Sequence, residues 1–89
     1  MSVFEVYEAI AVERERARDL RDRGVLAYVA SEVLRLAALV EEVGEVARCL
    51  HDYADLASLR LELVQVAGVA CSWVEAIDAV AADRAEPAT

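Results

Sequence analysis

The sequence predicts an all-α protein built from three long helices. Only three Gly and one Pro interrupt its 89 residues, and the helix-favouring residues Ala, Leu, Glu and Arg dominate throughout. The alternation of apolar and polar residues that marks a half-buried strand does not occur. Hydrophobic residues make up 58% of the chain, against roughly 45–50% in ordinary globular domains. Because so short a chain buries only about 60–65% of its surface when it folds alone, this excess predicts an oligomeric helical bundle.

The first helix is expected to begin after Ser2 and to run to about Arg23. Ser2 is the N-cap, and Glu5, three residues later, completes a capping box. Gly24 follows at the position where glycine commonly ends a helix. The apolar stripe of this helix consists of Phe4, Tyr7, Ile10 and Ala11.

The second helix is expected to begin between Val25 and Ser31 and to end near Asp52. Its apolar residues recur every three or four positions, which is the period of one helix face. They are Leu36, Leu39, Val40, Val43, Val46, Ala47 and Leu50. A break follows at residues 52–55, where Asp52 or Asp55 can cap the next helix.

The third helix is expected to run from that break to about Asp83. Between Leu59 and Val74 it is apolar on nearly every side, so it must be buried all round. Two helices of the same chain cannot surround it, and a second subunit is the simplest cover. We therefore predict one helical domain over residues 1–84, followed by a flexible tail at residues 85–89.

Charge and cysteine content exclude several classes of function. Nine Arg, no Lys and seventeen acidic residues give a net charge of −8, which opposes binding to nucleic acid. Charged residues interrupt every apolar run, and the N-terminus lacks a basic-then-apolar signal peptide, so we expect a cytoplasmic protein without a membrane partner. Cys49 and Cys71 are too few for a disulfide framework and are expected to be buried thiols.

Three acidic residues interrupt the apolar pattern of the second helix. At about 100° per residue, Glu41, Glu42 and Glu45 form one contiguous stripe. Like charges at this spacing repel one another, and the repulsion grows where water is excluded, so the stripe invites a cation. The bland alternative is a solvated face on which these acids pair with Arg48. Gly44, placed mid-helix, favours a close helix contact or a site.

A fourth acid, Glu62, stands alone in the most apolar part of the third helix and therefore needs a partner or a metal ion. An antiparallel turn at residues 52–55 would bring Glu45 and Glu62 to similar heights, about 10 to 15 Å from the turn. The carboxylates of both helices are then expected to converge. Oxygen ligands select Mg²⁺ or Mn²⁺ over zinc.

The arrangement of these acids resembles the E-E-x-x-E … E-x-x-D signature of the MazG-like, all-α nucleoside triphosphate pyrophosphohydrolases. The matching strings are Glu41-Glu42-Val43-Gly44-Glu45 and, sixteen residues later, Glu62-Leu63-Val64-Gln65. Glu13-Arg14 and the stretch from Leu59 through Ala76 are also similar to small stand-alone members, so the resemblance covers most of the chain. It implies Mg²⁺-dependent hydrolysis of NTP or dNTP to the monophosphate and pyrophosphate, by a homodimer or homotetramer.

Carried over by position, the resemblance makes Glu42, Glu45 and Glu62 metal ligands. Glu41 matches the leading Glu of the motif, which helps to bind metal or to orient water, and we expect it to be the catalytic base. Gln65 departs from the pattern because the family has Asp there. Its neutral carbonyl oxygen replaces a carboxylate, so metal affinity should fall.

Weaker candidates for substrate binding are Trp73, which can stack on a base, and Arg14, Arg18 and Arg48, which can reach phosphates. Core packing and a solvated surface are the bland alternatives for them. Three interpretations thus stay open: a nucleotide pyrophosphohydrolase, a catalytically impaired nucleotide-binding, metal-binding or interaction module, and an acidic helical partner without metal.

Overall fold

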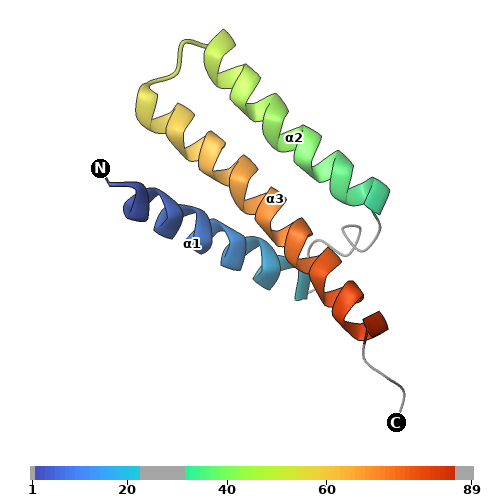
Figure 1. The fold of residues 1–89 in the computed structure, drawn as a ribbon. Helices are drawn as coiled ribbons and strands as arrows, with labels where there is room; N and C mark the ends of the chain where they lie inside the picture. Colours follow the sequence, from blue (N-terminus) through green and yellow to red (C-terminus); the bar gives the residue numbers. More distant parts are fainter. Residues whose placement is uncertain (1, 23–31, 86–89) are drawn as a thin grey trace.

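The computed structural model describes residues 2–22 and 32–85, and over these residues the chain forms three helices and no strand (Figure 1). The helices are α1 (Val3–Asp22), α2 (Glu32–His51) and α3 (Leu56–Ala85). The predicted all-α class is confirmed, and the described helix ends lie within two residues of the predicted ones. The expected breaker Gly24, the expected start of the second helix at residues 25–31 and tail residues 86–89 lie outside the described residues. Ala85, expected in the tail, is helical.

The predicted caps of α1 and α3 are formed. The backbone amide of Glu5 donates to the Ser2 hydroxyl at 3.3 Å, and the Ser2 amide donates back to the Glu5 carboxylate at 3.5 Å, which is a capping box. At the start of α3, the Ser58 amide donates to the Asp55 carboxylate at 2.7 Å. This hydrogen bond lowers the pKa of Asp55. Asp55 is therefore the residue that starts α3.

Between α2 and α3 the chain turns through Tyr53, whose φ of 54° is left-handed. The Ala54 amide donates to the Cys49 carbonyl at 2.9 Å, and the Tyr53 amide donates to the Leu50 carbonyl at 3.4 Å. These are the two hydrogen bonds of a Schellman motif, in which the left-handed residue is usually glycine. The turn reverses the chain, so α2 and α3 lie side by side and antiparallel (Figure 1).

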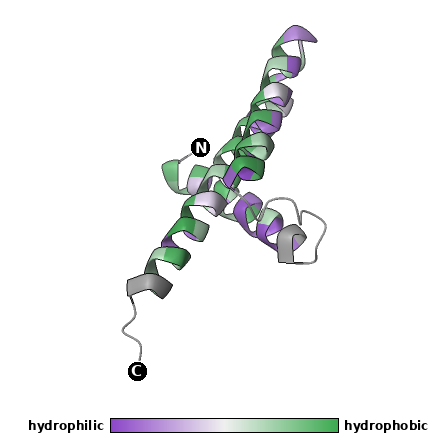
Figure 2. Ribbon diagram, turned by 90° about the vertical axis from the view of Figure 1, so that its right-hand side faces the viewer, coloured by the Kyte–Doolittle hydropathy of each residue, from purple (hydrophilic) through white to green (hydrophobic). Residues whose placement is uncertain are grey.

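The central helix is α3, against which both other helices pack (Figure 1). Over the described residues α1 and α2 do not touch each other. The molecule is elongated and measures 56 × 30 × 20 Å. In Figure 2, α1 crosses the other two helices at an angle, and hydrophobic residues alternate with hydrophilic ones along the helices. A single layer of helices has two open faces, so most side chains have a neighbouring helix on one flank only.

Gly68 lets α1 approach α3 closely. A Cβ atom at Gly68 would lie 2.8 Å from the Cβ of Glu13 and 3.1 Å from the Arg14 amide nitrogen. Atoms cannot approach that closely without a shift, so the crossing point depends on glycine. Gly44, for which we predicted a close contact, has nothing within 4 Å of such a Cβ atom. The chain's own described helices therefore do not supply that contact.

Little of the apolar surface is buried. Among the described hydrophobic residues, Val64 alone is classed as buried, at 8% exposed. As predicted, the two other helices of the chain do not surround α3, which keeps large apolar residues exposed between them. Cys71 is exposed and Cys49 is half-buried, so the predicted burial of both thiols is wrong. Both thiols are free.

By length and composition, the Leu56–Ala82 part of α3 is the one helix in the described residues that is apolar enough to cross a membrane. Only 17% of its most apolar window is buried inside the chain. The stretch also contains Glu62, Glu75 and Asp78. Over the described residues, the other helices of the chain leave most of this helix uncovered.

Candidate carboxylate site between α2 and α3

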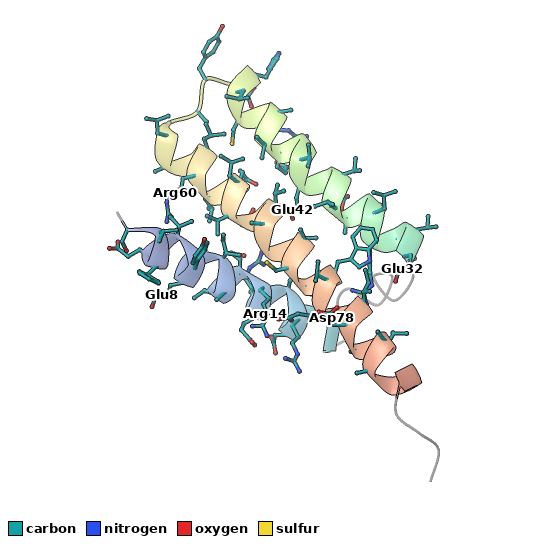
Figure 3. The ribbon with its side chains drawn as sticks, in the orientation of Figure 1. Glu8, Arg14, Glu32, Glu42, Arg60 and Asp78 are labelled. Atoms are coloured by element: carbon teal, nitrogen blue, oxygen red, sulfur yellow. The ribbon has the colours of Figure 1, made fainter. Side chains whose placement is uncertain are left out.

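The candidate site begins with the side of α2 that faces α3. This side carries Arg35, Leu39, Glu42, Val46 and Cys49, all of them buried or half-buried, at the three- and four-residue spacing of one helix face. Glu42 is thus a carboxylate inside the helix–helix contact, and Figure 3 shows it at the junction of α2 and α3.

Burial raises the pKa of Glu42, and the neighbouring Glu62 carboxylate raises it further. The charges of Glu45 and Glu13 act in the same direction, whereas Arg16 lowers this pKa. A half-buried carboxyl group among three other acids and one arginine is held in an unfavourable environment for its charged form. A bound cation would relieve that cost.

Glu62 lies across from the middle of α2. Its charge acts on Glu42 and also on the Cys49 thiol, whose pKa is raised by burial first and then by Glu62 and Glu45. Glu42 and Cys49 are two helical turns apart, so Glu62 faces the segment between them, which contains Glu45. The predicted equal height of Glu45 and Glu62 agrees with this placement.

The four motif acids are not equally placed. Glu42 and Glu62 are half-buried, whereas Glu41 and Glu45 are exposed. At about 100° per residue, Glu45 is turned about 60° from Glu42 on the wheel and Glu41 about 100°. Gln65 is half-buried one turn beyond Glu62. As placed, no three acidic, His or Cys side chains in the described residues are grouped tightly enough to hold a metal ion.

Helix α1 also contributes to this site, although no motif in the sequence indicates it. Glu13 is held against Gly68 of α3, and its side chain is only 15% exposed. Arg16 donates to the Glu13 carboxylate at 2.8 Å, and the charges of both reach Glu42. Two features of the sequence relate to this contact: a mid-helix glycine in α3, and an acid and an arginine three residues apart in α1. Sequence alone does not indicate that these two features lie together.

The weaker candidates lie elsewhere. Arg14 donates to Glu75 and, at 2.6 Å, to Glu15, which raises its pKa; Glu75 is about 20 Å along α3 from Glu62. The Trp73 indole donates to Glu32 at 2.6 Å, so it packs at the start of α2. Arg48 is exposed and, over the described residues, makes no ion pair with the motif acids.

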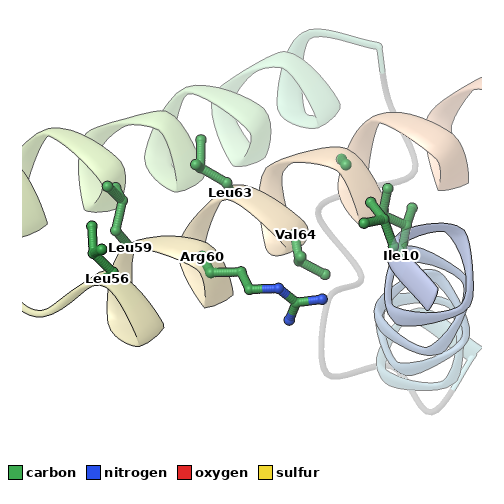
Figure 4. A pocket seen from close by; sticks show the side chains of 8 residues that line it. Ile10, Leu56, Leu59, Arg60, Leu63 and Val64 are labelled. Atoms are coloured by element: carbon green, nitrogen blue, oxygen red, sulfur yellow. The ribbon is translucent and has the colours of Figure 1, made fainter. Parts of the chain in front are cut away.

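Two hollows in the described part of the chain lie outside the carboxylate cluster. One, of about 350 Å³, is lined by Arg14, Arg18, Glu75, Ala76 and Ala79. The other, of about 340 Å³, lies between α1 and the first turns of α3 (Figure 4). Its lining is almost entirely apolar and consists of Val6, Ile10, Leu56, Leu59, Arg60, Leu63, Val64 and Ala67. Neither hollow contains a motif acid.

Comparison with known proteins adds no family to this geometry. The chain matches no protein-family model, no curated protein and no solved structure. The likeness to the MazG-like pyrophosphohydrolases therefore rests on the sequence motif alone.

Proposed function

We propose that the chain is a Mg²⁺-dependent nucleoside triphosphate pyrophosphohydrolase of the MazG-like type. It would convert NTP or dNTP to the monophosphate and pyrophosphate, in the cytoplasm, as a homodimer or homotetramer. The observation that carries the proposal is the half-buried Glu42, whose carboxyl group faces Glu62 within reach of the charge of Glu45. Those three residues are the metal ligands that the motif assigns.

By its chemistry the donor set suits a hard divalent cation, although the side chains of Glu42, Glu45 and Glu62 would have to move closer together to hold it. Glu42, Glu45 and Glu62 would hold it through oxygen atoms, with the weaker carbonyl of Gln65 beside them, and Mg²⁺ or Mn²⁺ takes such ligands. The bound ion supplies positive charge where an acidic chain must accept a polyphosphate, and it lowers the pKa of bound water.

Other side chains of the chain would bind substrate and move the proton. Glu41, exposed beside this cluster, would accept the proton of the attacking water. Arg16 already brings a guanidinium to the acids and is better placed for phosphate than Arg14, which two carboxylates engage. Trp73 would contact the base only after leaving Glu32.

A second candidate function is a catalytically impaired module that binds nucleotide or metal, or serves self-association. The specific observation in its favour is Gln65, half-buried next to the cluster where the motif has an acid. The loss of one negative charge reduces the attraction for a divalent ion.

Metal binding and turnover separate these functions. Calorimetry with Mg²⁺ and Mn²⁺ tests the metal site, and pyrophosphate release from a panel of NTPs and dNTPs tests the reaction. We expect release by the wild type and none by Glu45→Ala. Binding without release would support the impaired module, whereas wild-type release that Glu45→Ala leaves unchanged would contradict the hydrolase proposal.

Restoring the family's acid is the sharpest single change. Gln65→Asp should bind metal more tightly and hydrolyse faster, because it adds a carboxylate to the cluster. Gln65→Glu adds the same charge on a side chain one methylene longer and serves as the matched control. If Gln65→Asp changes neither property, Gln65 does not face the site.

A further inference from the structure

The outer face of α2 carries a continuous apolar stripe that no other helix of the described chain covers. We define the α2 stripe as Val33, Leu36, Val40, Val43, Ala47 and Leu50. Val33 is 75% exposed, Val40 59% and Leu50 62%. These are apolar side chains of a helix that already packs on α3 through a different side, so the stripe is a second contact surface.

The spacing of the α2 stripe is that of a helix–helix seam. Its members follow one another at intervals of three, four, three, four and three residues, the alternation by which two helices pack knobs into holes. The residues that face α3 form a separate row whose centre lies about 110° away on the wheel. The α3-facing row packs within the chain. The α2 stripe has the spacing of a helix contact, but no helix of the described chain packs against it.

The area left uncovered matches what a stable pair requires. A folded monomer of 9.7 kDa exposes about 5100 Å², whereas this chain exposes 6488 Å². The excess is about 1400 Å² per chain, or about 2800 Å² for two copies, and obligate homodimers bury roughly 2000–5000 Å². The surface in excess is thus of the size that pairing with a second copy of the same chain would cover.

Apolar residues of α3 extend the surface. Leu56, Leu63 and Val74 are 81%, 51% and 56% exposed, and their row lies about 100° beyond the side of α3 that faces α2. Because α2 and α3 are antiparallel, turning by the same angle about each helix axis, away from the side that faces the other helix, leads to the same face of the layer. The α2 stripe and these residues thus form one face, and Glu45 and Gln65 turn toward the opposite one.

We propose that the α2 stripe, continued by Leu56, Leu63 and Val74, is the seam through which two copies of this chain pair. This deepens the self-association proposed above and does not depend on catalysis. A lipid surface is the less favoured cover, because alternating three- and four-residue spacing is the pattern by which helices pack on helices, and a lipid surface does not require it. A second copy also supplies the heptad-spaced partner that the stripe needs.

Sedimentation of the purified full chain tests the seam. The wild type should have a mass of at least two chains, and Val40→Asp, which puts a charge at the middle of the stripe, should sediment as one chain. Val12→Asp is the matched control, because Val12 is 62% exposed on α1, and it should retain the wild-type mass. A wild-type monomer, or equal dissociation by both variants, would overturn the assignment of the seam.

A second measurement covers the case in which Val40→Asp does not fold. The wild-type melting midpoint should rise with chain concentration, as for any protein stabilised by association; a constant midpoint would refute the pairing. The wild type could also float with neutral or anionic vesicles and not pair when vesicles are absent. That result would favour a lipid surface as the cover and would refute the pairing of two copies. If the chain forms an oligomer but releases no pyrophosphate, only the hydrolase proposal is contradicted. If the chain is an active monomer, only the proposed pairing through the α2 stripe is contradicted.

Discussion

Replacing Gly68 by alanine tests how closely α1 crosses α3. The new Cβ atom would lie 2.8 Å from the Cβ of Glu13 and 3.1 Å from the Arg14 amide nitrogen. Neither neighbour is the free end of a flexible side chain, so α1 itself must move away. Because Glu13 and Arg16 reach the carboxylate cluster from α1, the same displacement should withdraw them from Glu42.

The expected magnitude follows from two opposing effects. Alanine stabilises a helix interior by about 1 kcal/mol relative to glycine, while overpacking at a close contact costs about 1–3 kcal/mol. Gly68→Ala should therefore lower the free energy of unfolding by about 0–2 kcal/mol. Gly44→Ala is the matched control because nothing lies within 4 Å of its Cβ, and it should raise that free energy by about 0.5–1 kcal/mol.

Urea denaturation at one fixed chain concentration measures both variants. The control is sound even beside the α2 stripe, because Ala37 already carries a methyl group at the equivalent position one heptad before Gly44. We expect the two variants to differ by about 1–3 kcal/mol. If Gly68→Ala and Gly44→Ala stabilise the chain equally, α1 does not approach α3 at Gly68. The placement of Glu13 beside the carboxylate cluster would then also be wrong.

Two further predictions concern the turn and the buried acid. Tyr53→Gly should raise the free energy of unfolding by about 1 kcal/mol, because glycine adopts the left-handed φ of 54° without strain; Tyr53→Ala keeps the strain, and an equal gain there would contradict the explanation. With a chelator present to remove metal ions, the free energy of unfolding of the wild type should fall as the pH rises from the ordinary carboxyl pKa through the raised pKa of Glu42. In that range the folded chain binds a proton on Glu42 that the unfolded chain has lost. Glu42→Gln should lose this dependence, as denaturation across pH would show; parallel curves would refute the assignment.

The helices of this fold were predictable because their signals are local. The capping box of Ser2 and Glu5, the cap at Asp55 and the three- and four-residue periodicity of α2 each involve residues within a turn of one another. The turn itself was located from its two aspartates, but its left-handed residue was not, because Tyr53 stands where glycine usually signals such a turn.

The candidate site was predictable in part. Periodicity indicated that Glu42, Glu45 and Glu62 occupy facing helices near one height, and the charges acting on Glu42 and Cys49 agree. The participation of Glu13 and Arg16 depends on where α1 crosses α3, which is a tertiary contact with no local pattern. Trp73, a weaker candidate for stacking on a base, lies about 16 Å along α3 from Glu62, and its indole donates to Glu32.

The two faces of the layer place opposite demands on stability. On one, half-buried acids repel one another and destabilise the folded chain unless a cation binds; on the other, exposed apolar residues contribute nothing until a second copy covers them. The described core contains only one buried hydrophobic residue. The folded chain therefore has little stability to offset the repulsion between the acids. Metal binding and association each stabilise the same folded state by mass action. The pairing proposed for the apolar face would therefore supply the stability that a cluster of carboxylates on the other face requires.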